Sequence, residues 1–175
     1  MIIRYIEEKA DKVLKDTNCF TIPVDVITCA SEMGIKVNEV DLEEGVSGLF
    51  VIKDKVAHIG YNKNHPENRR RFTIAHELGH YLLHSKETFL FVDKEEKVLY
   101  RNMESSSGEH QKEREANAFA AALLMPKDLL LEEIKEYDFE SGKKLPDFLA
   151  NKFNVSEQAM TIRLTNLGLI DFGLF

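Results

Sequence analysis

Two histidines and a glutamate stand at a spacing that could bind and use a metal ion. The chain reads His76-Glu77-Leu78-Gly79-His80, the pattern H-E-x-x-H. In a helix of 3.6 residues per turn, His76 and His80 are offset by about 40° and share one face. Glu77 lies about 100° round the same helix, where it could reach a metal-bound water without competing as a ligand. The spacing predicts a catalytic zinc site with His76 and His80 as ligands and Glu77 as general base.

A catalytic zinc needs a third protein ligand and one open position. His84 continues the spacing of four, but three side chains from one straight helix lie in a row and do not enclose a tetrahedral ion. We expect His84 at the helix end, against the helix dipole. An Ala-rich segment further along contains Glu113, Glu115 and Asn117. Glu113 and Asn117 share a helix face, whereas Glu115 points nearly the opposite way. We therefore predict Glu113 as the third ligand, Asn117 as a hydrogen-bond acceptor for a ligating histidine, and Glu115 as a solvated charge.

The elements that must position these residues follow from the hydrophobic periodicity, which predicts an α+β fold. We expect a small β-sheet packed on the motif helix and on the Ala-rich helix, followed by a short helical C-terminal element. The predicted helices span 2–15, 24–33, 66–84, 110–125, 128–137 and 145–153, and a last helix runs from its N-cap Ser156 to about 167. Within 66–84, the apolar residues 72, 75, 78 and 82 form a stripe along one side of the helix. The predicted strands are 35–40, a hairpin of 48–52 and 56–61, and a second hairpin of 89–92 and 98–100.

The composition is that of a globular protein, with 43% hydrophobic and 30% charged residues. A net charge of −7 argues against a broad nucleic-acid surface. No apolar run approaches the roughly 20 residues that a membrane span needs. Residues 1–16 alternate apolar and charged side chains, as an amphipathic helix does and a signal peptide does not, so we expect a cytoplasmic protein. Cys19 and Cys29 form no Cys-x-x-Cys motif and are expected to be buried thiols.

With these residues in place, the chain resembles the ImmA/IrrE family of metallo-endopeptidases. The segments that carry the resemblance are 71–84 and 113–126, and the second is the more diagnostic because unrelated peptidases share H-E-x-x-H. The likeness extends over about residues 20–170. It implies a zincin-like, gluzincin-type core with two histidines and one glutamate on Zn²⁺. We expect the zinc metallopeptidase domain to span 1–137 and a small helical element to span 138–175.

The resemblance also implies a substrate class, the helix-turn-helix repressors of the Xre type, encoded nearby and cut to relieve repression. In the expected reaction a metal-activated water attacks the peptide bond while Glu77 takes its proton. The donor that stabilises the oxyanion stays open among Tyr61, Tyr81 and His110. The predicted strand 48–52 is either an edge on which an extended substrate pairs or a hairpin strand with no substrate role.

Two other functions compete with the peptidase interpretation. The first is an inactive zincin scaffold that binds a repressor or acts as a toxin–antitoxin partner, and the intact Glu77 argues against it. The second is a DNA-binding regulator, suggested by the helical tail. Residues 141–175 carry four Lys or Arg against three Asp or Glu, which is too little positive charge to neutralise phosphates. We therefore expect the tail to dock a protein partner, with no direct contact to nucleic acid or membrane.

Overall fold

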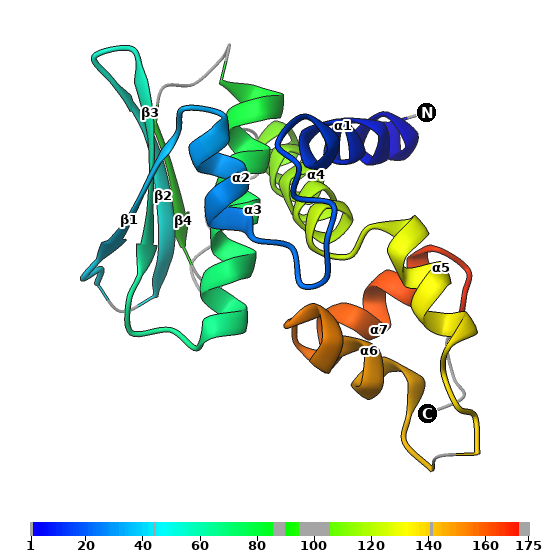
Figure 1. The fold of residues 1–175 in the computed structure, drawn as a ribbon. Coiled ribbons are helices and arrows are strands. Elements are labelled where there is room, and N and C mark those ends of the chain that lie inside the picture. Colours follow the sequence, from blue (N-terminus) through cyan, green and yellow to red (C-terminus); the bar gives the residue numbers. More distant parts are fainter. Residues whose placement is uncertain (1, 44, 86–89, 95–105, 141, 172–175) are drawn as a thin grey trace.

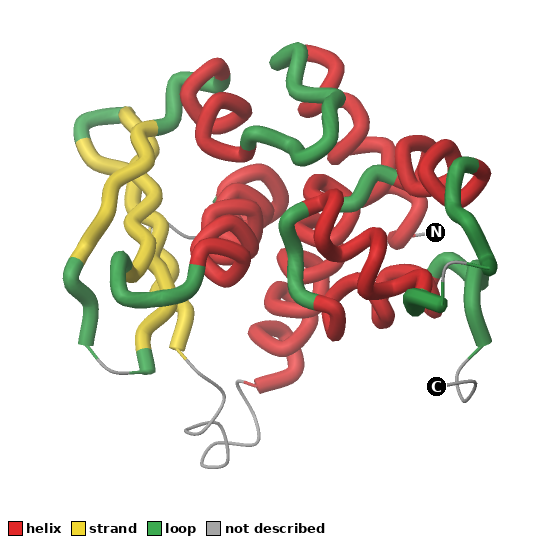
Figure 2. Tube along the Cα trace, turned by 60° about the horizontal axis from the view of Figure 1, so that its bottom comes forward, coloured by secondary structure: helices red, strands yellow, loops and turns green. Residues whose placement is uncertain are grey.

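The helix that carries the H-E-x-x-H pattern packs across one face of a small mixed sheet, in an α+β fold (Figure 1). Figure 2 shows the strands gathered on one side and helices on the other. The computed structural model describes residues 2–43, 45–85, 90–94, 106–140 and 142–171. In chain order the elements are α1 (Ile2–Asp16), α2 (Val26–Glu32), β1 (Lys36–Val40), β2 (Val46–Lys53), β3 (Val56–Asn62), α3 (Glu67–His84), β4 (Leu90–Lys94), α4 (Ser106–Leu124), α5 (Lys127–Lys135), α6 (Leu145–Phe153) and α7 (Glu157–Asn166).

Strand β2 lies inside the sheet. The strand order is β1-β3-β2-β4, with β1 parallel to β3 and β2 antiparallel to both of its neighbours. β2 and β3 form the predicted hairpin, and its turn holds Asp54 and Lys55 at φ values of 52° and 65°, the left-handed conformation of tight hairpin turns. The idea that 48–52 offers an edge to a substrate is wrong, because β3 and β4 pair with β2 on both sides.

The second predicted hairpin is described only in part. A strand does form close to 89–92, where β4 pairs with β2. Its predicted return strand, 98–100, lies outside the described residues. The Ala-rich helix begins earlier than predicted, since α4 starts at Ser106 and not at residue 110.

Side-chain caps set the start of two helices. The Asp25 carboxylate accepts a hydrogen bond from the backbone N–H of Thr28 at 3.0 Å, so α2 begins two residues later than predicted. Ser156 caps α7 as predicted, and its hydroxyl oxygen accepts from the backbone N–H of Ala159 at 3.1 Å. Both caps satisfy backbone donors that the first turn of a helix leaves without a partner.

The middle of α3 is buried on all sides. Every residue from Thr73 to His80 is buried, although the sequence predicts a one-sided apolar stripe. The sheet covers one face of α3 and α4 covers another, so side chains on both faces are enclosed (Figure 1). A helix covered in this way lacks the usual amphipathic pattern. His76, Glu77 and His80 therefore lie in the interior of the protein.

α3 and α4 approach closely because the contact is built from small residues. A Cβ atom added at Gly79 would stand 3.1 Å from the Cα and 3.2 Å from the carbonyl oxygen of Ala116. Ala116 and Ala120 are both fully buried. The absence of a side chain at Gly79 thus lets the backbone of α4 lie directly against α3, beside the two motif histidines.

α1 is the predicted amphipathic N-terminal helix, and it packs against α4. Its buried face includes Ile6, Ala10 and Leu14. α1 also contacts α3, where the Lys9 ammonium donates a hydrogen bond to the backbone carbonyl of Leu82, in the last turn of α3, at 2.8 Å. α1 therefore links α3 and α4 from the outside. Among the residues described, no helix is both long and apolar enough to cross a membrane.

Two arginines tie the C-terminal helices to the rest of the chain. Arg71 of α3 donates to the backbone carbonyls of Phe153, at 3.4 Å, and Asn154, at 3.2 Å. Arg163 of α7 is buried and forms an ion pair with Glu7 of α1. The helical tail is therefore fastened both to the motif helix and to the N-terminal helix. The division of the chain into two domains stays a prediction.

We expect Gly79→Ala to destabilise the protein by about 1–3 kcal/mol, because the new methyl group meets backbone atoms that cannot rotate away. The control is Gly108→Ala in the partner helix α4, where an added Cβ meets nothing within 4 Å. That control should leave stability unchanged or raise it by roughly 0.5–1 kcal/mol. Urea unfolding followed by circular dichroism measures both. Equal stability of the two variants would mean that the α3–α4 contact tolerates a wider spacing.

Candidate metal centre

His76 and His80 project from one face of α3, as their spacing predicts. Their Nε2 atoms lie 3.0 Å apart. The two residues are buried, with His76 3% and His80 1% exposed. The rings stand edge to face, with centroids 4.6 Å apart. Two imidazole nitrogens are thus held at one point in the interior of the protein.

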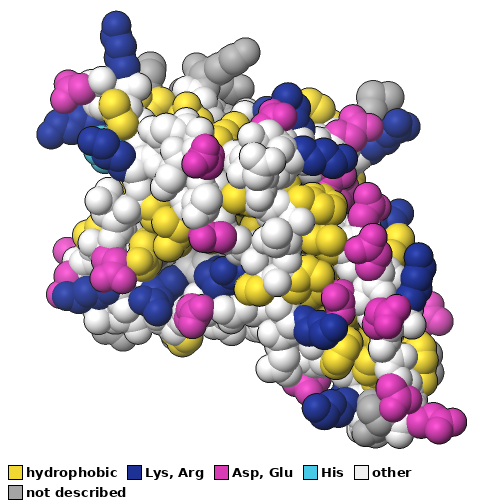
Figure 3. All heavy atoms as spheres, viewed as in Figure 1, with side chains coloured by type: hydrophobic (Ala, Val, Ile, Leu, Met, Phe, Trp, Pro, Cys, Tyr) yellow, Lys and Arg dark blue, Asp and Glu magenta, His cyan; other side chains and the backbone are white. Residues whose placement is uncertain are grey.

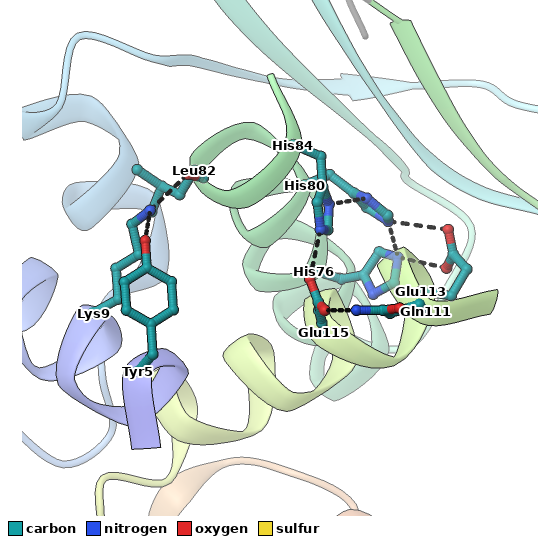
Figure 4. Close-up of polar contacts among 9 residues, drawn as sticks. All are labelled: Tyr5, Lys9, His76, His80, Leu82, His84, Gln111, Glu113 and Glu115. Atoms are coloured by element: carbon teal, nitrogen blue, oxygen red, sulfur yellow. Dashed lines mark hydrogen bonds and ion pairs between the residues drawn. The ribbon is translucent and has the colours of Figure 1, made fainter. Parts of the chain in front are cut away.

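Glu113 of α4 closes this arrangement from the opposite side. Its Oε2 lies 3.2 Å from His76 Nε2, and its Oε1 lies 3.1 Å from His80 Nε2 (Figure 4). A tetrahedral ion with bonds of about 2.0–2.1 Å places its ligand atoms roughly 3.3 Å from one another. The observed separations therefore fit three ligands of a single metal ion. The Glu113 side chain is 41% exposed, which leaves one side of the cluster open to solvent.

The protonation states of the cluster also suit a metal ion. Burial by itself raises the pKa of the Glu113 carboxyl, but hydrogen bonds with the His76 and His80 rings outweigh burial and hold this pKa below its ordinary value. Burial lowers the pKa of His80, although the contact with Glu113 acts in the opposite direction. A deprotonated carboxylate and neutral imidazoles are the forms in which these side chains bind metals.

Asn117 lies where it can orient His76. Its Oδ1 is 3.0 Å from His76 Nδ1, one helical turn after Glu113 on α4. An Nδ1–H that donates to this oxygen leaves the Nε2 lone pair of His76 directed at Glu113 and His80. This contact has the geometry that the sequence predicts for Asn117, while its role toward a metal ion stays a prediction.

The interpretation of Glu115 as a solvated charge is wrong. Its side chain is only 21% exposed, and its Oε2 lies 3.1 Å from Nε2 of His84. Its Oε1 accepts from the Gln111 amide at 2.7 Å. Hydrogen bonds with Gln111 and His84 keep the pKa of the Glu115 carboxyl below its ordinary value. His84 is the last residue of α3, as expected, but it is buried against His80 and does not simply face the helix dipole.

Glu77 is fully buried between α3 and the sheet. A Cβ atom added at Gly48 of β2 would stand 3.1 Å from Glu77 Oε1 and would collide with the methyl group of Thr73. Gly48 therefore leaves the space that the Glu77 carboxylate occupies. The role of Gly48 was not recognised from the sequence, although a glycine inside a strand often marks a close approach of another element.

The three candidates for an oxyanion donor occupy different environments. The Tyr61 hydroxyl donates to Glu39 Oε1 at 3.0 Å. The Tyr81 ring packs edge-on against Phe50, with centroids 5.7 Å apart. His110 is exposed on α4, one turn before the predicted ligand. None of these contacts selects one of them, so the donor stays unassigned. Both cysteines are free and buried, as expected.

The chain matches one family model over most of its length. The model is described as Peptidase_M78, IrrE N-terminal-like domain, and it matches residues 30–165. No curated protein matches the chain. The matched region contains every residue of the cluster described above, including both contributing helices.

We expect Glu113→Ala to weaken Zn²⁺ binding at least about 100-fold, because the substitution removes one of three converging side chains. Losing a ligand should cost more affinity than losing a residue that only contacts a ligand, which costs roughly 10–100-fold. Glu109→Ala, an exposed glutamate one turn earlier on α4, is the control and should bind Zn²⁺ like the unchanged chain. Competition with a chromophoric chelator measures both affinities. Full affinity in Glu113→Ala would assign the third ligand elsewhere.

Asn117→Ala should weaken Zn²⁺ binding by about 10–100-fold, since it removes the hydrogen-bond acceptor for His76 Nδ1. Asn117→Asp keeps an oxygen at the same position and is expected to retain most of the affinity. The same chelator competition compares the two variants. If alanine and aspartate behave alike, the contact with His76 does not orient the ring.

Proposed function

Because the chain belongs to the IrrE-like M78 family of metallopeptidases, we propose that it is a zinc-dependent endopeptidase that cleaves a helix-turn-helix repressor of the Xre type. The observation that supports the peptidase part of this proposal is the convergence of two imidazole nitrogens and a carboxylate, whose atoms lie within 3.0–3.2 Å of one another. The family match shows the class of hydrolase. The metal, the residue roles and the repressor are our proposals.

Zinc is the metal that this ligand set favours, because two neutral imidazoles and one carboxylate are a recurring catalytic zinc site in gluzincin-type peptidases. His76, His80 and Glu113 would hold it, with Asn117 orienting His76. When bound, zinc supplies Lewis-acid activation of a water molecule and of the scissile carbonyl. The partial exposure of Glu113 supports access for both from solvent.

Glu77 acts as the general base in this proposal. Glu77 directly follows His76 on α3, so its side chain is rotated about 100° around the helix axis from that of His76. The carboxylate therefore lies beside the metal ligands and is not itself a ligand. As the oxygen of water adds to the peptide carbonyl carbon, Glu77 accepts the proton. It then delivers this proton to the amine nitrogen as the C–N bond breaks. Gly48 supports this role because it leaves the carboxylate space against β2.

The repressor substrate rests on the resemblance to ImmA/IrrE proteins, whose members cut repressors encoded beside them. A cytoplasmic location is proposed for the same reason, since such repressors act on DNA inside the cell. The competing DNA-binding function finds little support in the surface. On the face drawn in Figure 3, the described Lys and Arg side chains are interspersed with Asp and Glu and do not form a continuous basic stripe.

Glu77→Gln separates a peptidase from a scaffold that only binds. We expect this variant to bind Zn²⁺ and the repressor normally but to cleave about 10²–10⁴-fold more slowly, because an amide cannot take the proton from water. Glu132→Gln, an exposed substitution on α5, is the matched control. The measurement is a time course of cleavage, followed by gel electrophoresis, with the helix-turn-helix repressor encoded beside the gene of this protein as substrate. Cleavage at the unchanged rate removes Glu77 from the mechanism, and the lack of cleavage by the unchanged protein despite binding favours the scaffold.

A further inference from the structure

We propose that His84 and Glu115 are positioning residues that fix the tautomer of His80 and so direct its Nε2 lone pair at the metal position. The two residues form a chain of contacts that leads away from the cluster, and Figure 4 shows it as a continuous series of dashed lines. The inference rests on the metal site of the proposed function and concerns residues that the ligand set itself does not include.

The contacts run in one direction from the surface to the ligand. Gln111 Nε2 donates to Glu115 Oε1 at 2.7 Å, and Glu115 Oε2 lies 3.1 Å from His84 Nε2. His84 Nδ1 in turn lies 3.3 Å from His80 Nδ1. The side chain of His84 is only 6% exposed, so protein contacts, including those with Glu115 and His80, hold its ring in place. The remaining ring nitrogen of His80, Nε2, is the one that faces Glu113 and His76.

With a neutral His84, and with His80 Nε2 bound to a metal ion, hydrogen-bond chemistry allows one arrangement of protons along this chain. A carboxylate only accepts, so Glu115 requires the hydrogen of a neutral His84 to be on Nε2. Nδ1 of His84 is then an acceptor, and it requires a hydrogen on Nδ1 of His80. A neutral imidazole with its hydrogen on Nδ1 has its lone pair on Nε2, which is the atom that a metal ion would bind. Glu115 thus sets the tautomer of a ligand through an intermediate ring.

A doubly protonated His84 would produce the opposite result. Both of its nitrogens would donate, and His80 Nδ1 would have to accept. His80 would then carry its hydrogen on Nε2 and could not bind a metal ion through that atom. A simple buried ion pair between His84 and Glu115 is therefore incompatible with the ligand geometry, and the two arrangements can be told apart by experiment.

The packing of the two helices explains why α4 can reach both histidines of the cluster. Ala116 of α4 lies directly against Gly79 of α3. Glu115 and Asn117 are the residues on either side of Ala116, and they contact His84 and His76 respectively. A single close contact between helices therefore positions an outer partner for each ligating histidine.

The test compares variants that keep or remove a hydrogen-bond acceptor next to His80. In His84→Asn the amide oxygen takes the place of Nδ1, whereas His84→Leu offers no acceptor. We expect His84→Leu and Glu115→Ala each to weaken Zn²⁺ binding by about 10–100-fold, and His84→Asn to stay within about threefold of the unchanged chain. The double variant His84→Leu/Glu115→Ala should bind no more weakly than His84→Leu, because both substitutions interrupt the same chain.

The second readout is the hydrogen bond itself, from the ring ¹H and ¹⁵N chemical shifts of His80 in the Zn²⁺-loaded full chain. The His80 Nδ1–H resonance should show a hydrogen bond in the unchanged protein, and Glu115→Ala should move this resonance to the position of a weaker one, because His84 then lacks the acceptor that fixes its ring. Unfolding midpoints of the metal-free variants separate an effect on the ring from a loss of folding. Should His84→Leu fail to fold, Glu115→Ala at its partly exposed position decides the matter alone.

The proposal is overturned if Glu115→Ala binds Zn²⁺ within twofold of the unchanged chain, or if the His80 Nδ1–H resonance of the Zn²⁺-loaded chain does not change. Neither readout involves peptide cleavage. A protein that cleaves no repressor can still satisfy the tautomer proposal, and a protein that cleaves its repressor can still contradict it.

Discussion

The contact between Gly79 of α3 and Ala116 of α4 is the constraint on which the site depends. The backbones of the two helices meet there with no room for a side chain. Because residues three and four positions apart lie on one helix face, this contact places the middle turns of α4 beside the histidines of α3. A wider spacing would separate the Glu113 carboxylate from both imidazoles, which now lie 3.1 and 3.2 Å from it.

The site is polar and yet lies in the interior of the protein, which imposes a second constraint. Burying imidazole and carboxylate groups is unfavourable unless partners replace the water that they lose. In this chain the ligands contact one another, and outer residues on α4 contact the rings from behind. Burial lowers the pKa of His80 and so favours its neutral form, and hydrogen bonds with both histidines favour an anionic Glu113, which are the forms that bind a metal ion.

Most helices and strands could be predicted from the sequence, because their periodicity and their caps are local. Ser156 caps α7 where a cap is predicted, and β2 and β3 form the predicted hairpin. The errors concern contacts between elements. Of the two interpretations of strand 48–52, the free edge is wrong because β4 pairs on its outer side, and this pairing depends on residues far along the chain. Glu115 was interpreted as solvated because helix phase alone turns it away from Glu113, and phase does not reveal that His84 lies within its reach.

The sequence by itself determined which side chains of one helix share a face, since 3.6 residues per turn is a property of the backbone. That was enough to pair His76 with His80 and to set Glu77 apart from them. The choice of Glu113 over Glu115 also used the side chain of Asn117, which shares the face of Glu113 and can accept a hydrogen bond from a histidine. Only the tertiary structure decided how closely α4 approaches α3, that Glu115 reaches His84, and that Gly48 leaves space for Glu77. These features depend on the packing of side chains between segments distant in sequence, and no local periodicity encodes that packing.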